Sequence, residues 1–125
     1  MKDYKVEVVS CSKELTVREK IQLKDTTTAE KIDNLTQGGD LVIPVACHVQ
    51  LHIVNPASEN GEYDVYVFVD PDGNKFVTGS ESLWTSYIDI YNEMAEAGET
   101  DFSICVTRKP SKKREGKDFL TCSLV

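Results

Sequence analysis

A basic segment near the C-terminal end of the chain carries the side chains best suited to recognising another molecule. The run from Arg108 to Lys117 holds six of the 14 basic residues, and Phe119 follows it closely. Cations of this kind can neutralise phosphates, and aromatic rings beside them can stack on bases, which is how single-stranded nucleic acid is commonly bound. A solvated hairpin loop would also be basic, so the segment alone leaves both interpretations open.

The two histidines do not predict a metal site. On a helix, the i, i+4 spacing of His48 and His52 would let both rings reach one ion, but on a strand they lie about 13 Å apart. Asp70 and Asp72 lie in a tight-turn sequence that is too short for an EF-hand calcium loop. A glycine-rich phosphate loop, a nucleophile elbow and paired carboxylates are likewise missing from the sequence. We therefore expect no metal, no cofactor and no enzymatic activity.

Charge is distributed unevenly along the chain. The net charge of −7 argues against a protein that coats nucleic acid by bulk charge. Residues 108–125 nevertheless carry six basic and two acidic residues, whereas residues 1–107 carry eight basic and nineteen acidic ones. The basic charge is therefore local.

The elements that must position these side chains begin with a long strand predicted over residues 40–55. Side chains alternate between the two faces of a strand, so one face is apolar and the other is mixed. The apolar face, which we expect to be core, carries Ile43, Val45, Cys47, Val49, Leu51 and Ile53. The other face, which we expect to be wet, carries Pro44, Ala46, His48, Gln50 and His52.

The next strand, predicted over residues 62–70, is apolar on both faces. Three valines point one way, while Tyr66 and Phe68 point the other way. If the valines face the core, the two aromatic rings either lie open to a ligand or are covered by the N-terminal residues or by another subunit. A short strand over residues 75–78 completes a hairpin with this strand.

The remaining elements are one helix and several shorter strands. Alternating residues predict an N-terminal hairpin from residues 4–8 and 15–23, and Thr26 to Thr28 can cap a turn of helix after it. A capping-box sequence, Thr78-Gly79-Ser80-Glu81, and helical spacing predict a helix that runs to Gly98, with Trp84 and the helix tyrosines in the core. Two strands, one beginning near Phe102 and one ending the chain, follow it.

This order of elements is that of a five-stranded OB-fold barrel with one α-helix between strands 3 and 4. We expect a single, mainly β domain in which residues 1–39 form an N-terminal hairpin extension and residues 40–125 form the barrel. In such a barrel an oligonucleotide crosses strands 2 and 3, between the loops at residues 55–61 and 108–117. The nucleic-acid-binding residues predicted on this basis are His48, Gln50, His52, Tyr66, Phe68, Lys75, Phe76, Lys112, Lys113, Arg114, Lys117 and Phe119.

Several short stretches resemble the single-stranded DNA-binding proteins of bacteriophages and mobile elements, particularly those of phages with protein-primed replication. The stretches are Thr36-Gln37-Gly38-Gly39-Asp40, Phe68-Val69-Asp70-Pro71-Asp72-Gly73, Thr78-Gly79-Ser80-Glu81-Ser82 and the ending from Ser111 to Leu124. The resemblance implies an OB fold, binding with little sequence preference, and protection of strands during DNA replication or transfer. The chain ends without the acidic tail with which related housekeeping proteins recruit replication proteins, which puts that kind of partner in doubt.

The rival hypothesis is a protein–protein interaction module that binds no nucleic acid, which the acidic body of the chain favours. An exposed N-terminal edge strand could also pair with a second subunit to form a homo-oligomer, or simply cap the barrel. No apolar run approaches the ~20 residues of a membrane-spanning helix, and the start lacks a signal-peptide core. We therefore expect a cytoplasmic protein with no membrane partner, whose four cysteines are reduced and mostly buried.

Overall fold

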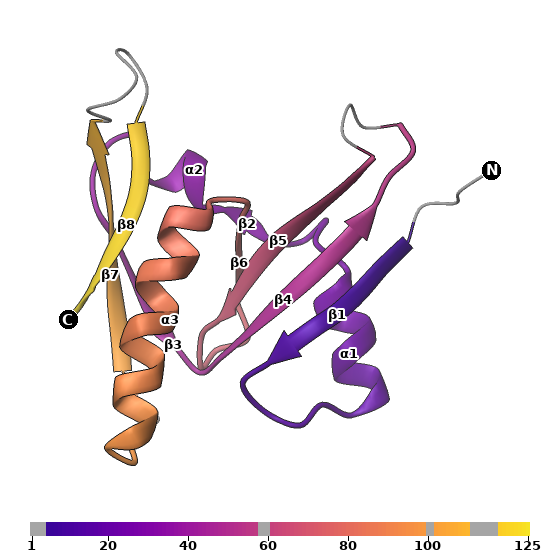
Figure 1. Ribbon diagram of the computed structural model, residues 1–125, viewed down its shortest axis with the longest axis horizontal. Helices are drawn as coiled ribbons and strands as arrows, with labels where there is room; N and C mark the ends of the chain where they lie inside the picture. The colour runs from indigo at the N-terminus through magenta and orange to yellow at the C-terminus, as the bar shows by residue number, and fades with distance from the viewer. Residues whose placement is uncertain (1–4, 58–60, 100–101, 111–117) are drawn as a thin grey trace.

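The computed structural model describes residues 5–57, 61–99, 102–110 and 118–125, which form a mainly β fold (Figure 1). The elements, in chain order, are β1 (Lys5–Cys11), α1 (Val17–Lys24), β2 (Glu30–Lys31), α2 (Ile32–Leu35), β3 (Leu41–Val45), β4 (Cys47–Val54), β5 (Glu62–Val69), β6 (Lys75–Thr78), α3 (Glu81–Glu96), β7 (Phe102–Pro110) and β8 (Asp118–Leu124). In these ranges we find no helix with the length and apolar character that crossing a membrane requires.

The strands form two sheets that share one bent stretch of chain. The first sheet has the order β1-β4-β5-β6-β2, and the second has the order β3-β7-β8. The strand predicted over residues 40–55 is therefore two strands in different sheets, with a bend at Ala46, whose N–H donates to the carbonyl of Val69 at 2.8 Å. Because β6 pairs with β2 and not with β8, the described strands do not close into one barrel.

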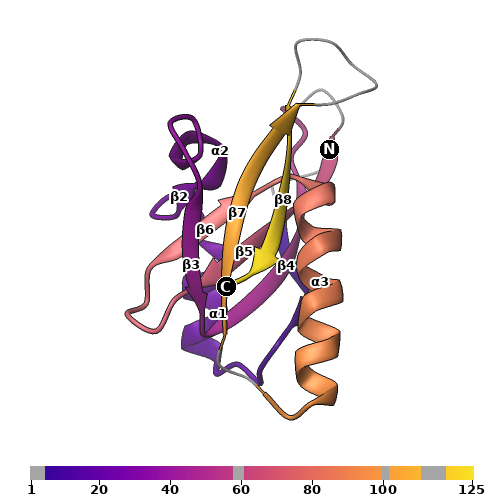
Figure 2. The ribbon, with the colours of Figure 1, turned by 90° about the vertical axis from the view of Figure 1, so that its left-hand side faces the viewer.

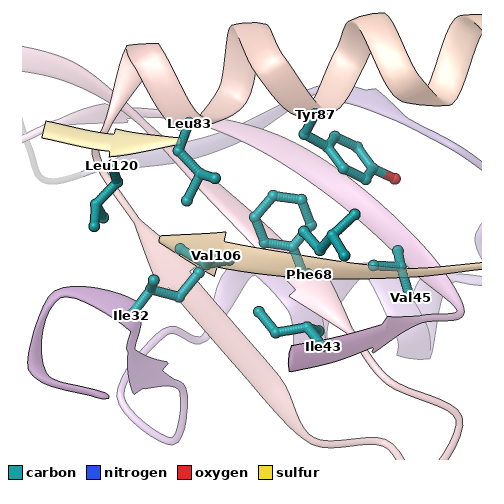
Figure 3. Packing of buried hydrophobic residues seen from close by; sticks show 9 residues of the cluster. Ile32, Ile43, Val45, Phe68, Leu83, Tyr87, Val106 and Leu120 are labelled. Carbon is teal, nitrogen blue, oxygen red and sulfur yellow. The ribbon is translucent and has the colours of Figure 1, made fainter. Parts of the chain in front are cut away.

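The main core lies between the two sheets and helix α3. Phe68, on β5, is fully buried at its centre, with Leu83 and Tyr87 packed against it from α3 (Figure 3). Ile43 of β3 and Val106 of β7 cover it from the second sheet. The predicted helix is confirmed with its buried side toward this core, although Ser80, and not Thr78, is the residue that caps it by accepting from the N–H of Leu83.

A second, smaller core covers the opposite face of the first sheet. Val49 and Leu51 of β4 and Val67 of β5 pack there against Leu23 of α1. Figures 1 and 2 show α3 on one face of this sheet and α1 on the other. The sheet is therefore covered on both faces, which explains why both faces of β5 are apolar.

The predicted N-terminal hairpin is wrong in its second half. β1 exists and pairs with β4, but residues 17–24 form helix α1. Thr16 and Glu19 make a capping box, in which the Thr16 hydroxyl accepts from the Glu19 N–H at 3.2 Å and the Glu19 carboxylate accepts from the Thr16 N–H at 3.2 Å. This local device fixes the helix start and outweighs the apolar alternation from Leu15 to Leu23, which had predicted a strand.

The predicted turn of helix after Thr28 is also displaced. Residues 30–31 form β2, which pairs in parallel with β6, and the single turn of α2 follows it. Ile32 of α2 is fully buried in the main core. Of the four free cysteines only Cys47 is buried, and the other three are half-buried, which corrects the expectation of mostly buried thiols.

Candidate functional site

The aromatic row predicted to stack on bases lies under helix α3. Tyr66 is 4% exposed and Phe68 is fully buried, while Phe76 packs half-buried against the main core. Trp84 stacks on Tyr66, with ring centroids 4.6 Å apart and planes 12° from parallel. Of the two alternatives that the sequence leaves open, Tyr66 and Phe68 are therefore covered, and the covering element is α3 and not the N-terminal residues.

His48 is part of the same buried cluster, so the predicted wet face of β4 is wrong at this position. Its side chain lies among Trp84, Tyr87 and Tyr91, and its Nδ1 is 2.6 Å from the hydroxyl of Tyr87. Burial lowers the pKa of His48 to about 4. The ring is therefore neutral at neutral pH and offers no charge to a phosphate.

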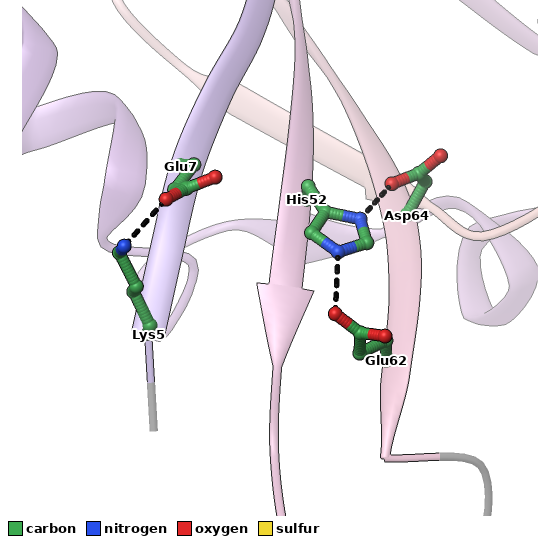
Figure 4. Close-up of polar contacts among 5 residues, drawn as sticks. All are labelled: Lys5, Glu7, His52, Glu62 and Asp64. Carbon is green, nitrogen blue, oxygen red and sulfur yellow. Dashed lines mark hydrogen bonds and ion pairs between the residues drawn. The ribbon is translucent and has the colours of Figure 1, made fainter. Parts of the chain in front are cut away.

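Gln50 and His52, further along β4, have acidic partners, and Figure 4 shows His52 between Asp64 and Glu62, which we call the acidic row. The Nδ1 of His52 is 2.7 Å from the Asp64 carboxylate and its Nε2 is 3.3 Å from the Glu62 carboxylate, both on β5. Gln50 donates to the second oxygen of Asp64 at 3.3 Å. With carboxylates as its main partners, this part of the face suits a phosphate backbone poorly.

The pKa values of the two histidines are expected to lie on opposite sides of the ordinary value of 6.5, with that of His48 lowered and that of His52 raised. The hydrogen bonds of His52 to Asp64 and then to Glu62 raise its pKa, so the stabilisation from this pairing is complete below pH 6.5 and is lost as the pH rises through the raised pKa. Proton NMR titration of both imidazoles measures this directly. Asp64→Asn should lower the pKa of His52 and leave that of His48 in place; a His52 pKa at or below 6.5 in the parent protein would contradict the pairing.

The remaining predicted binding residues are five basic residues and Phe119. The Lys75 ammonium donates to the carbonyls of Gln22 and Asp25, at 2.8 and 2.7 Å, and so holds the end of α1. Phe119, on β8, keeps 40% of its surface exposed. The other four predicted cations, Lys112, Lys113, Arg114 and Lys117, lie outside the described residues.

A groove of about 350 Å³ lies on the opposite face of the first sheet, the face that α1 covers only in part. It crosses three neighbouring strands through Ile53 of β4, Val65 of β5 and Val77 of β6. Tyr63, 37% exposed, is the aromatic side chain among its described lining residues. The remaining lining residues are Thr26, Lys31, Asp33, Thr78 and Gly79.

The groove exists because α1 is short. Leu23 is its buried residue and sits over the middle of the sheet, on Val49 and Val67. From Asp25 the chain crosses to β2, which pairs along the far edge of β6. The part of the sheet nearest the connection between β4 and β5 therefore has no helix over it.

A second hollow, of about 290 Å³, lies beside α1 and includes Cys47 and Val69. Its two lysines are already engaged, because Lys75 holds the end of α1 and Lys13 pairs with Glu19 at 2.8 Å. Its described lining contains no aromatic ring. The groove with Tyr63 is the better candidate for binding a planar group.

Charge distinguishes the two faces of the first sheet. Helix α3, on one face, carries four carboxylates and no lysine or arginine. Helix α1, on the groove face, carries Arg18, Lys20 and Lys24 with the single acid Glu19. The two faces of the sheet therefore differ in charge, although the net charge of the protein is negative. The groove face should repel a polyanion less than the face beneath α3 does.

Tyr63 was not among the residues predicted from the sequence, although its position carries a signal. It shares the face of Val65, Val67 and Val69 but stands two residues before them, at the end of β5. An aromatic ring at the end of an otherwise aliphatic face can be left uncovered when a short helix covers the rest.

No protein-family model, curated protein or solved structure matches this chain.

Proposed function

We propose that this protein binds single-stranded DNA through the groove that contains Tyr63. The observation that carries the proposal is the placement of an exposed aromatic ring and a lysine, Lys31, in one groove that crosses three strands. A base can stack on the ring while the lysine neutralises a neighbouring phosphate, and each base–aromatic stack contributes about 1–3 kcal/mol to binding. Protection of strands exposed during replication or transfer is the role such binding would serve.

The strand order supports an OB-type interpretation of the fold. If β3 and β4 are taken as one bent strand, β5 and β6 follow it by hairpins and β7 returns beside it, which is the Greek-key order. A partly open five-stranded Greek-key barrel is the description of an OB fold, which would be completed here by β8. Ligands of OB folds lie on the face of strands 2 and 3, which correspond to β5 and β6.

The sequence of the connection between β7 and β8 adds positive charge to this proposal. Lys112, Lys113, Arg114 and Lys117 belong to that connection, and the connection between the fourth and fifth strands is one of the two that flank the binding face of an OB fold. We propose that these four cations neutralise phosphates. Single strands are favoured over duplex because stacking on Tyr63 needs a base with a free face.

Tyr63→Ala is expected to weaken binding of a labelled oligo-dT by about tenfold, because it removes the stacking surface. Tyr63→Phe keeps the ring and should remain within about twofold of the parent protein. Fluorescence anisotropy at fixed low salt measures both, with matched duplex as a competitor that should fail. Equal affinities for the alanine variant and the parent would remove Tyr63 from the site, and no binding at low salt would favour a protein-interaction module instead.

Lys31→Ala is expected to reduce the salt dependence of binding. Each neutralised phosphate of a single strand contributes about 0.7 to the slope of log affinity against log salt, so the slope should fall by about that amount. Lys5→Ala is the matched control, since Lys5 pairs with Glu7 at 2.6 Å near the acidic row on the other face (Figure 4). A slope that Lys31→Ala leaves unchanged would place the phosphates elsewhere.

A further inference from the structure

Asp33 places a carboxylate in the groove, where a phosphate-binding site would not be expected to have one. Its side chain is exposed and lines the groove together with Tyr63 and Lys31. The contacts of Asp33 run through its backbone carbonyl, which accepts from Arg108 Nη2 at 2.9 Å and from Gln37 at 3.1 Å. Within the residues that the structure describes, no ion pair or hydrogen bond occupies its carboxylate.

A bare carboxylate is unfavourable beside a polyanion unless it receives hydrogen bonds from the ligand. A phosphate offers no donor, so Asp33 would weaken a site that held only the DNA backbone. A base stacked on Tyr63 presents its Watson–Crick edge, which in a single strand is free to bond. The carboxylate is therefore suited to the edge of a base and not to the backbone.

We infer that the groove selects guanine at one position of the bound strand through the Asp33 carboxylate. Guanine carries two adjacent donors on its Watson–Crick edge, N1–H and the N2 amino group, which match the two oxygens of a carboxylate, whereas thymine has N3–H alone between two carbonyl oxygens. Bidentate pairs of this kind discriminate between bases more strongly than single bonds. This inference rests on the proposed function and adds a base preference to it.

The test compares three labelled oligonucleotides of equal length: oligo-dT, the same strand with isolated dG residues, and the same strand with deoxyinosine in place of dG. We expect the dG strand to bind about tenfold more tightly than oligo-dT. Deoxyinosine keeps N1–H but lacks the N2 amino group, so its strand should fall between the other two. Measurement is by anisotropy under one salt condition.

Asp33→Asn should remove the preference for dG, because the amide has one acceptor oxygen in place of two, and should tighten binding of oligo-dT by removing a negative charge. Glu30→Gln is the matched control: it removes the same charge from β2, three positions before Asp33 and outside the described lining of the groove, and should keep the preference. Binding of all three strands with equal affinity overturns the inference and leaves the proposed function intact. Failure of every strand to bind overturns the proposed function, and this inference with it.

Discussion

Phe68→Ala is expected to lower the free energy of unfolding by about 3–5 kcal/mol, as is usual when a buried phenylalanine is truncated. Phe68 is fully buried and meets Tyr87 edge-on, with ring centroids 4.7 Å apart. The truncation would leave a cavity between the two sheets and α3. Closing this cavity would require neighbouring segments to lose packing contacts of their own. Urea unfolding followed by the fluorescence of Trp84, which stacks on Tyr66, measures the loss.

Phe119→Ala makes the same chemical change at a position that is 40% exposed and should cost less than about 1 kcal/mol. The affinity of the Phe68→Ala variant for oligo-dT also separates a structural role of Phe68 from a binding role. If Phe68 only supports the fold, the folded fraction of Phe68→Ala keeps the parent affinity for oligo-dT. A stable, fully folded Phe68→Ala protein with weakened binding would return the site to the face that the sequence had predicted.

Acidification is expected to destabilise the protein through His48, by up to about 3 kcal/mol at pH 4 and below. Burial lowers the pKa of His48 from 6.5 to about 4, so the unfolded chain takes up a proton in this range more readily than the folded one. The loss begins as the pH falls through 6.5 and is complete below about 4. It runs opposite to the trend of His52, whose raised pKa stabilises the fold at low pH.

His48→Gln removes the titrating group and isolates this effect from that of the carboxylates. Urea unfolding of the variant and the parent at pH 7, 5.5 and 4.5 gives the difference in stability at each value. We expect the variant to be the less stable protein at pH 7, because its amide replaces a ring packed against three aromatic residues, and the gap to shrink as the pH falls. Parallel curves would show that folding does not lower the pKa of His48.

The alternation of side chains along β4 and β5 could be read from the sequence, but which face would be covered by a helix could not. The valines of β5 were correctly grouped apart from Tyr66 and Phe68. Both sets are apolar, and local pattern does not say which long-range partner reaches which face. Helix α3 packs on the aromatic face, where Trp84 contacts Tyr66 and Tyr87 contacts Phe68.

The predictions for residues 15–23 and for the strand over residues 40–55 were wrong for different reasons. The Thr16-x-x-Glu19 capping box was present in the sequence, but the alternation of Leu15, Val17, Ile21 and Leu23 also fits a strand, and the two signals compete over a span of only eight residues. The bend at Ala46 has no glycine to mark it. It arises where one strand must leave the second sheet and enter the first, which is a property of the tertiary arrangement.

In the candidate site, too, some features could be predicted from the sequence and others depend on distant elements. Phe119 was correctly expected to be accessible, whereas Lys75 proved to be a partner of α1, a helix that the sequence had not predicted. Tyr63 became a candidate only once the reach of α1 was known, because its exposure depends on where that helix ends. Positions whose burial depends on a distant element are the ones that sequence pattern could not place.

The central claim is that single-stranded DNA lies on the face of the first sheet that contains Tyr63, and not on the face beneath α3. Backbone amide chemical shifts of the ¹⁵N-labelled protein, titrated with oligo-dT, map the bound face residue by residue. We predict the largest changes at Lys31, Tyr63, Val65 and Val77, with the amides of α3 nearly unmoved. Changes concentrated on α3 and on β4 near His48, or no changes at a saturating concentration of the oligonucleotide, would contradict it.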